Sequence, residues 1–489
     1  MDLRQVREFV LRRRLLYLWP SGFCTSGGGP DESGPVSLYR ATMGAPSQAQ
    51  PRRVFLETYG CQMNVADSEL VSGVLSRHGY LRTPDPAEAD VLLLNTCAIR
   101  ERAEERVLGR LSELLRYKTA RPAVQMGLLG CMASHLRDRL LDAAPYLDLI
   151  IGPDGYRDLP RLLEQGEDPR IDVRLDRGET YADLEPELAE GPRAWLTVMR
   201  GCDKFCTFCV VPFTRGRERS LPPDAVLSQV EAAVALGKRE IVFLGQTVNA
   251  YSAEGVDFAA LLRRAAAIDG LERIRFTSPH PSNVSDDLIE AFADEPKIMP
   301  YMHLPLQSAS NGVLEAMARD YKIEEYRDLL YRFREAVPSL ALSTDIIVGF
   351  PGEEERDFEE TAAFLEEVRY DFAYLFKYSP REGTRAFKIP DSVSEEEKGR
   401  RLTRLIERQE QISFEKNREL IGAEVEVMVE GEARRNEGFV FGKSRNFKTT
   451  VFPDPGVTMG TVVRTRVESA TAHTLKGMVS ALSGFSDWH

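Results

Sequence analysis

The chain has 489 residues, which is too long for one ordinary hydrophobic core and predicts about three domains. Its net charge of −13 argues against a surface coated in nucleic acid, so any contact with RNA must come from local patches. No run of about 18 apolar residues occurs in the sequence, and we therefore expect no membrane span.

The cysteines and the first residues indicate where the protein works. Disulfide frameworks belong to short secreted chains, and this chain is long. Arg12, Arg13 and Arg14 interrupt the apolar stretch that a secretory signal peptide needs. An arginine-rich start also suits a mitochondrial transit peptide, although Asp2 and Glu8 count against one. We expect a cytoplasmic protein, since a reducing compartment keeps thiols free.

Residues 1–52 predict a disordered amino-terminal extension. The stretches 27–30 and 47–51 contain Gly, Ser and Pro and show little apolar periodicity. Cys24 lies in this tail and is interpreted as incidental, and Met43 is an alternative start of translation.

Residues 53–169 alternate short apolar runs with helical stretches. The apolar runs at 54–56, 91–94 and 124–129 are typical of buried parallel strands. Helical patterns at 68–78 and 100–117 lie between them. This order predicts an α/β domain with an open, doubly wound parallel sheet.

A cysteine follows each of these three strands, namely Cys61, Cys97 and Cys131. Parallel strands end at the same edge of a sheet, so the loops that follow them converge there. We therefore expect these three thiols to meet. The plainer alternative is that they are three buried cysteines that act as small apolar side chains.

Residues 188–417 repeat a strand and a polar loop six times, which predicts a partial (β/α)6 barrel. In such barrels the chemistry lies at the carboxyl ends of the strands. The expected strands are 195–199, 241–244, 274–276, 302–306, 342–348 and 372–376.

In residues 420–483 the long helical patterns end, and short strand-like runs alternate with Gly-rich turns. This pattern predicts a small antiparallel β-barrel. The expected strands are 425–429, 439–441, 449–452 and 461–467.

The most specific motif is the short loop that holds Cys202, Cys206 and Cys209. Three thiolates can hold three irons of a 4Fe-4S cluster and leave the fourth iron open. A structural zinc site is the alternative, but it needs a fourth ligand, and no further His or Cys lies close in the sequence.

This loop, placed after the first barrel strand, resembles that of the radical S-adenosylmethionine enzymes. The resemblance implies that the open iron binds S-adenosyl-L-methionine. It also implies that one electron, from a donor such as flavodoxin or ferredoxin, cleaves the sulfonium to give a 5′-deoxyadenosyl radical.

Three further motifs narrow the resemblance to the methylthiotransferases of this superfamily. They imply that Cys61, Cys97 and Cys131 hold a second 4Fe-4S cluster, which supplies the sulfur. The resemblance covers roughly residues 53–478. Its motifs are Thr58-Tyr-Gly-Cys-Gln-Met-Asn64 with Asp67-Ser-Glu69, Asn95-Thr-Cys97, and Gly130-Cys131.

Within this family, Cys61-Gln-Met-Asn64 is most similar to the branch that acts on N6-isopentenyladenosine at position 37 of tRNA. The implied product is the 2-methylthio derivative, and the implied partner is the anticodon stem-loop, bound by a monomer. Two positions depart from the pattern of that branch. Thr247 stands where asparagine is usual, and Pro279 is inserted before His280.

The resemblance also implies a pocket for S-adenosylmethionine around the later barrel strands. In radical barrels the strand at 342–348 packs the adenine and places polar groups near the ribose. An ordinary strand followed by a Gly turn and a helix cap fits the same spacing. The candidate residues are His303, Gln307, Ser343, Asp345, Gly349 and Glu353.

Three arginines follow the cysteine loop at Arg215, Arg217 and Arg219. Arginine prefers planar anions, so these side chains are candidates for contact with a phosphate or a carboxylate. A solvated charged face is an equally good interpretation.

The last segment mixes basic and aromatic residues at Lys443, Arg445, Phe447 and Lys448. Such mixtures suit single-stranded RNA, in which bases stack on rings and phosphates meet cations. The methylthiotransferases carry an RNA-binding barrel called TRAM at this place. Without that resemblance, a solvated hairpin is the better interpretation.

Two other functions remain open from the sequence. One is a methylthiotransferase for threonylcarbamoyladenosine in tRNA or for a ribosomal protein. The other is a non-catalytic iron–sulfur carrier, which would not need the six-stranded barrel or the last domain.

Overall fold

The computed structural model describes residues 51–98, 101–166, 169–434 and 437–482. The extension expected over residues 1–52 therefore lies outside the described residues up to position 50, as do Cys24 and Met43. Among the described helices, none is both long and apolar enough to cross a membrane.

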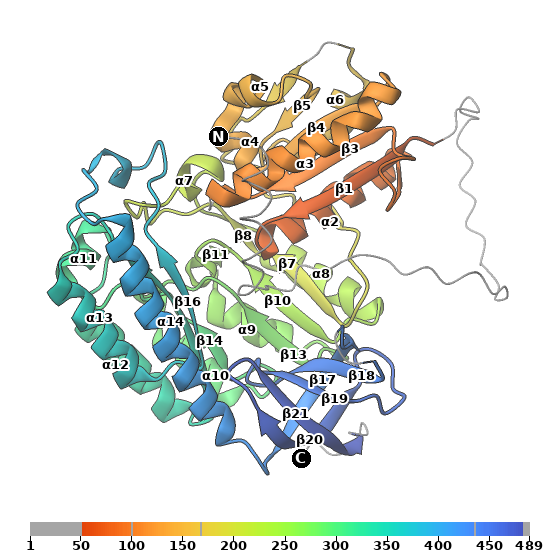
Figure 1. Cartoon of the computed structure of the whole chain (residues 1–489). Helices are drawn as coiled ribbons and strands as arrows, with labels where there is room; N and C mark the ends of the chain where they lie inside the picture. The colour runs from red at the N-terminus through yellow and green to blue at the C-terminus, as the bar shows by residue number, and fades with distance from the viewer. Residues whose placement is uncertain (1–50, 99–100, 167–168, 435–436, 483–489) are drawn as a thin grey trace. The chain divides into compact units, whose positions relative to one another are not determined.

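The amino-terminal segment forms a six-stranded sheet in the order β2-β1-β3-β4-β5-β6, with every pairing parallel. Helices cover the sheet on both sides, and two separate apolar clusters fill the two interfaces (Figure 1). This confirms the predicted doubly wound sheet. The strands are β1 (Arg53–Tyr59), β2 (Leu81–Arg82), β3 (Val91–Thr96), β4 (Gln125–Gly130), β5 (Leu149–Ile151) and β6 (Arg170–Asp172); the helices are α2 (Gln62–Arg77), α3 (Glu101–Ala120), α4 (Cys131–Leu136), α5 (Leu140–Ala143) and α6 (Leu159–Glu164).

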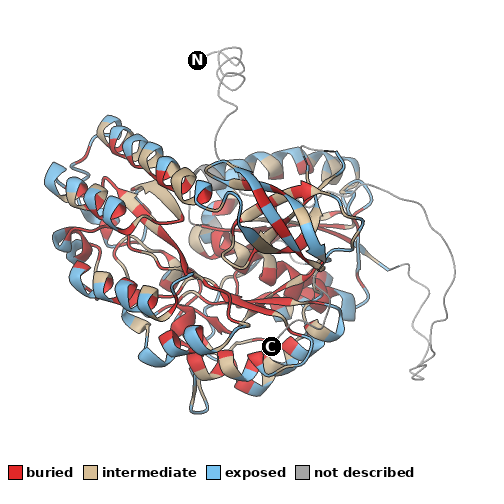
Figure 2. Cartoon of the chain, turned by 90° about the horizontal axis from the view of Figure 1, so that it is seen from below, coloured by how far each residue is buried: buried red, intermediate tan, exposed pale blue. Residues whose placement is uncertain are grey.

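Six parallel strands of the middle segment form the predicted partial barrel. They pair as two three-stranded sheets, β13-β10-β7 and β14-β15-β16. Helices lie outside them, and the strands are largely buried, as the red strands of Figure 2 show. The strands are β7 (Arg193–Thr197), β10 (Glu240–Leu244), β13 (Arg273–Phe276), β14 (Tyr301–His303), β15 (Ala341–Val348) and β16 (Phe372–Lys377).

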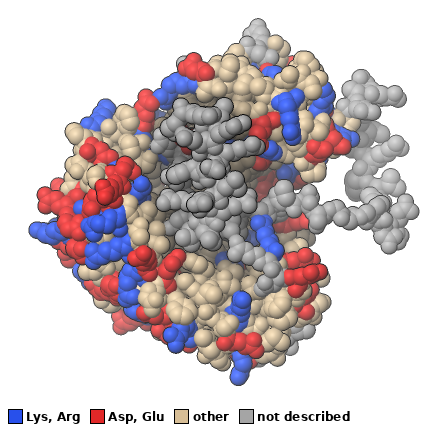
Figure 3. All heavy atoms as spheres, viewed as in Figure 1, with Lys and Arg blue, Asp and Glu red and all other residues tan. Residues whose placement is uncertain are grey.

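The helices of this segment alternate with the strands. The longer ones, such as α12 and α13, bury an apolar face and leave charged side chains outward. On the face drawn in Figure 3, acidic and basic side chains are mixed. The helices are α7 (Val211–Thr214), α8 (Pro223–Ala235), α9 (Phe258–Ala266), α10 (Asp286–Asp294), α11 (Asn311–Ala316), α12 (Ile323–Ala336), α13 (Glu355–Val368) and α14 (Glu395–Arg418); two short strand pairs are β8 (Met199–Arg200) with β9 (Arg219–Ser220) and β11 (Ser252–Ala253) with β12 (Val256–Asp257).

The last segment is a closed five-stranded barrel in the order β17-β18-β19-β21-β20. Its core is small and apolar and includes Val427, Val440, Phe452 and Val463. The four predicted strands are present, and a fifth, β21, closes the barrel. The strands are β17 (Glu424–Glu432), β18 (Phe439–Ser444), β19 (Thr449–Pro453), β20 (Val462–Ala470) and β21 (Thr474–Leu482).

Candidate cluster and cofactor sites

The three amino-terminal cysteines lie at the carboxyl edge of the parallel sheet, each in a different connection. Cys61 follows β1 and caps α2, Cys97 follows β3, and Cys131 is the first residue of α4. The Cys61 and Cys97 thiols hydrogen-bond to each other, and the charge of Cys61 acts on Cys131. The fold thus brings together three thiols that are far apart in the sequence.

Two glycines permit this close approach. Gly60 has a φ of +145°, and a Cβ there would lie 2.7 Å from the Cβ of Cys97. Gly130 has a φ of +91°, and a Cβ there would lie 2.6 Å from the carbonyl oxygen of Thr96. Glycine accepts both the backbone angle and the contact, which side chains would not.

The surroundings shift the pKa values of Cys61 and Cys131 in opposite directions. The hydrogen bond with Cys97 lowers the pKa of Cys61 to about 6, against the effect of burial. Burial raises the pKa of Cys131, and the Arg215 guanidinium opposes that rise. Thiolates are the form that binds metals, and the lowered pKa of Cys61 favours its thiolate.

The second cysteine set lies between β8 and β9, which pair in an antiparallel manner on either side of the loop. The Cys202 sulfur lies 3.1 Å from the Thr247 hydroxyl, and Arg319 donates to the Cys206 sulfur at 3.4 Å. Burial raises the pKa of Cys209 to about 12, with the charge of Cys206 adding to that rise.

No three His, Cys, Asp or Glu side chains of the described residues come close enough together to hold a single metal ion. A structural zinc site needs four ligands on one ion. The cysteines of a four-iron cluster instead bind separate irons and stand further apart. Each set supplies three free thiols, and this donor set fits a four-iron cluster that keeps one iron open.

Arg215 connects the two cysteine regions. It follows α7 in the barrel segment, and its Nε donates to the Cys131 sulfur at 3.1 Å. Its Nη2 donates to Asp67 at 2.8 Å, and Arg200 binds the other oxygen of Asp67 at 2.9 Å. Helices α4 and α7 lie side by side at this point (Figure 1).

The three arginines after the cysteine loop therefore do not share one environment. Arg215 and Arg219 are buried, and Arg219 binds Asp154 at 2.8 Å. Arg217 is exposed and pairs with Asp203 at 2.6 Å. The interpretation as a solvated face holds for Arg217 and is wrong for the other two.

Several buried polar atoms at the carboxyl ends of barrel strands have no hydrogen-bond partner within the described part of the chain. They belong to Gln246 after β10, His280 after β13, Gln307 after β14 and Tyr378 after β16. Each such atom costs about 1–3 kcal/mol unless something satisfies it. A polar ligand at this end of the barrel would satisfy these atoms. Of the four residues, only Gln307 belongs to the pocket predicted from the sequence.

His303, Ser343 and Asp345 form one connected group inside the barrel. His303 Nδ1 lies 2.8 Å from the Ser343 hydroxyl, and its Nε2 lies 3.4 Å from an Asp345 oxygen. Tyr301 also shares the Ser343 hydroxyl at 2.7 Å, and Tyr374 packs edge-on against His303. The structure thus brings together three of the six predicted pocket residues.

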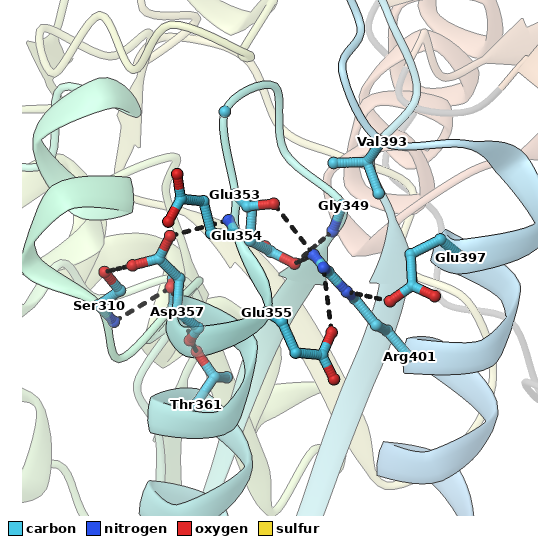
Figure 4. A network of polar contacts seen from close by, with 12 residues as sticks. Ser310, Gly349, Glu353, Glu354, Glu355, Asp357, Thr361, Val393, Glu397 and Arg401 are labelled. Carbon is cyan, nitrogen blue, oxygen red and sulfur yellow. Dashed lines mark hydrogen bonds and ion pairs between the residues drawn. The ribbon is translucent and has the colours of Figure 1, made fainter.

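Gly349 and Glu353 form a separate group in the loop between β15 and α13 (Figure 4). The Glu353 carboxylate accepts from the Gly349 amide at 2.9 Å and from Arg401 on α14 at 2.7 Å. Gly349 has a φ of +73°, and Lys398 packs where a Cβ would lie. The Glu353 side chain therefore fixes the shape of this loop, and the loop is tied to α14.

The four residues predicted to contact RNA pack against the amino-terminal end of the barrel. Phe447 stacks on Tyr301, and Lys448 is 6% exposed and binds Asp371 at 2.8 Å. Arg273 and Arg275 donate to backbone carbonyls of this turn, while the Lys443 ammonium and the Arg445 guanidinium also have partners within the chain. The predicted RNA role of these four is untested, and the structure gives them contacts that join two domains.

Family models match the three segments in turn. Residues 53–152 match the uncharacterized protein family UPF0004, residues 196–365 match the radical SAM superfamily, and residues 418–479 match the TRAM domain. Two sets of three cysteines on this fold define the class as a radical S-adenosylmethionine methylthiotransferase.

Curated relatives identify the particular family. The tRNA-2-methylthio-N(6)-dimethylallyladenosine synthase of Chloroherpeton thalassium is 42% identical over 88% of this chain and 96% of its own length. The enzymes of the same name from Christiangramia forsetii and Yersinia enterocolitica are 39% and 41% identical over 90% and 88% of this chain, and 96% and 92% of their own lengths. The chain belongs to the family of tRNA-2-methylthio-N(6)-dimethylallyladenosine synthases.

Solved structures agree with the fold. The radical S-adenosylmethionine methyltransferase TsrM from Kitasatospora setae, with cobalamin and a 4Fe-4S cluster bound, matches with a TM-score of 0.52. The match covers 80% of each chain at 13% identity, so the similarity concerns the fold alone. A second structure of TsrM, with tryptophan and an S-adenosylmethionine analogue, matches with a TM-score of 0.50 and 14% identity over 66% of this chain and 72% of its own.

Proposed function

We propose that this chain adds a methylthio group to C2 of N6-isopentenyladenosine beside the anticodon of tRNA. It would use S-adenosylmethionine and two 4Fe-4S clusters, one held by each cysteine set. The observation that supports this most is that two sets of three cysteines lie in two different segments of the fold, and that Arg215, which follows the second set in the chain, donates to the sulfur of Cys131 in the first. The shared name of the relatives supports the substrate.

The cysteine loop at Cys202, Cys206 and Cys209 would hold the cluster that binds S-adenosylmethionine. When bound, these groups would supply a 5′-deoxyadenosyl radical, and the second cluster would supply sulfur. The target C–H bond at C2 is unactivated, which makes a radical a reasonable reagent. The unpartnered atoms of Gln246, His280, Gln307 and Tyr378 would bind the polar parts of the ligand.

The interior group of His303, Ser343 and Asp345 is our candidate for the contacts that orient the cofactor or the base. The three side chains hold one another in place, so the group is pre-organised. Gly349 and Glu353 would act indirectly, because their polar groups are already used within the loop.

The RNA contacts of the TRAM barrel would come from its outer strands. Arg464, Arg466 and Lys476 are exposed on β20 and β21, which pair with each other. Phosphate contacts by such cations dominate the affinity for RNA and depend on salt. We assign the tRNA to this surface in place of the half-buried turn at Lys443 to Lys448.

Nucleoside analysis tests this function. A strain that lacks its own methylthiotransferase would be complemented with this chain, and the tRNA would be digested and analysed by mass spectrometry. The proposal expects 2-methylthio-N6-isopentenyladenosine to return. It also expects no return in a strain that cannot attach the isopentenyl group.

The alternatives give other outcomes in the same experiment. A methylthio group on threonylcarbamoyladenosine, or on a ribosomal protein, would move the chain to another branch of the family. A carrier of iron and sulfur would restore neither product, and its clusters would not respond to S-adenosylmethionine.

A further inference from the structure

The guanidinium of Arg215 has one nitrogen whose N–H groups find no acceptor in the described part of the chain. Its Nε is bound to the Cys131 sulfur and its Nη2 to Asp67, but Nη1 is buried and has no partner among the described residues. Arg215 itself is 3% exposed. A buried, charged N–H without an acceptor is costly, so its position beside the thiols needs an explanation.

The orientation of this side chain is strongly fixed. Asp67 is fully buried and receives Arg215 on one oxygen and Arg200 on the other, at 2.8 and 2.9 Å. Tyr156 also donates to Asp67, at 3.3 Å. Arg200 lies over the ring of Tyr181 at 4.7 Å. These contacts hold the guanidinium in the plane that brings Nε to the Cys131 sulfur.

The chemistry of a guanidinium at this place differs from that of a surface arginine. The positive charge lies within reach of both Cys131 and Cys61, in surroundings that water does not screen. Hydrogen bonds to sulfur and nearby positive charge are the means by which proteins set the potential of an iron–sulfur cluster. Both stabilise the reduced form, which carries one more negative charge.

We infer that Arg215 is a positioning residue for the amino-terminal cluster, which donates hydrogen bonds to its sulfur atoms and raises its reduction potential. This inference rests on the proposed second cluster. Arg215 belongs to the barrel and lies six positions after Cys209, so the radical-generating segment would itself tune the sulfur-donating cluster.

A redox titration tests the inference in the full-length chain. Cys202, Cys206 and Cys209 would be replaced by Ala, so that reconstitution with iron and sulfide fills only the amino-terminal set. The midpoint potential of that cluster would be measured by electron paramagnetic resonance. Arg215→Met should bind the same amount of iron and shift the midpoint to more negative values.

Two further variants sharpen the test. Arg215→Lys keeps the charge but not the fork of N–H groups, and it should shift the midpoint by less than Arg215→Met does. Arg217→Met removes the exposed arginine two positions away and should leave the midpoint where it was.

The outcomes separate this inference from the proposed function. If the parent binds no iron, the second cluster of the proposed function is wrong. If Arg215→Met binds iron with an unchanged midpoint, or if Arg217→Met shifts it equally, the inference is wrong and the function stands. Loss of iron from both Arg215 variants in folded protein would also overturn it, in favour of a purely structural role.

Discussion

Phe447 of the carboxy-terminal barrel stacks on Tyr301 of the central barrel, with ring centroids 4.7 Å apart and planes inclined by 22°. Tyr301 in turn shares a hydrogen bond with Ser343, which contacts His303. The last domain thus closes the amino-terminal end of the barrel that carries the candidate site.

Replacing the Phe447 ring should weaken the contact between the carboxy-terminal barrel and the central barrel. Phe447→Ala is expected to lower the free energy of unfolding by roughly 2 kcal/mol, less than for a fully buried ring because Phe447 is half-buried. Thermal unfolding of the full chain measures the change. Met459→Ala, at a side chain 52% exposed in the same domain, is the control and should change stability by less than about 0.5 kcal/mol.

The ion pair between Asp371 and Lys448 predicts a dependence on pH. Burial by itself would raise the pKa of Asp371, but the ammonium groups of Lys448 and Lys416 outweigh burial and lower it. A depressed folded pKa stabilises the fold above the unfolded value of about 3.9, and this contribution disappears as the pH falls through the folded pKa. Asp371→Asn should therefore cost about 3 kcal/mol at pH 7 and progressively less below about pH 4.

Denaturant unfolding of the variant and its parent across pH measures this difference. Glu360→Gln removes an exposed partner of Arg356 and should be close to neutral at every pH. A cost for Asp371→Asn that stayed constant down to pH 2 would show that the carboxylate charge is not what stabilises this contact.

The exposed cations of β20 and β21 predict where tRNA binds. Arg464→Ser and Arg466→Ser should each weaken tRNA binding and reduce the dependence of the affinity on salt by about one phosphate contact. Filter binding over a range of salt concentrations gives both quantities. Arg356→Ser, on the exposed face of α13, should change neither. Equal effects from the three variants would mean that only total charge matters.

The sequence located the strands well because buried parallel strands are short apolar runs that local composition reveals. It did not find the short strands β2, β5, β6, β9, β11 and β12, nor the longer strand β21. The short strands have only two or three residues each, and β21 mixes apolar, polar and small side chains without a long apolar run. That Cys61, Cys97 and Cys131 lie close together could be predicted from the strand order alone, because parallel strands end at one edge of the sheet.

Side-chain environments that depend on tertiary packing were not predictable in this way. The mixture of basic and aromatic residues around Lys443 to Lys448 resembles an RNA-binding surface in the sequence alone. In the fold it docks against Tyr301 and Asp371, which buries Lys448 and half-buries Phe447. Arg215 and Arg217 are two residues apart and have the same charge, yet one is buried against Cys131 and the other is exposed. The partner that distinguishes them lies in another domain.

The number of clusters can be counted directly. Anaerobic reconstitution should give about eight irons and eight sulfides per chain, from two four-iron clusters. Replacing Cys202, Cys206 and Cys209 by Ala should leave about half of the iron. Retention of all the iron, or zinc in its place, would contradict the assignment of these ligands.

The measurement that tests the central claim most directly follows two products of one reaction in the Cys61→Ala variant. Because Cys202, Cys206 and Cys209 lie in a different segment, their loop should stay intact and some 5′-deoxyadenosine should form. No methylthiolated adenosine should appear, since the amino-terminal set would be broken. Methylthiolated adenosine from this variant would contradict the account, as would complete loss of 5′-deoxyadenosine while the loop still holds its iron.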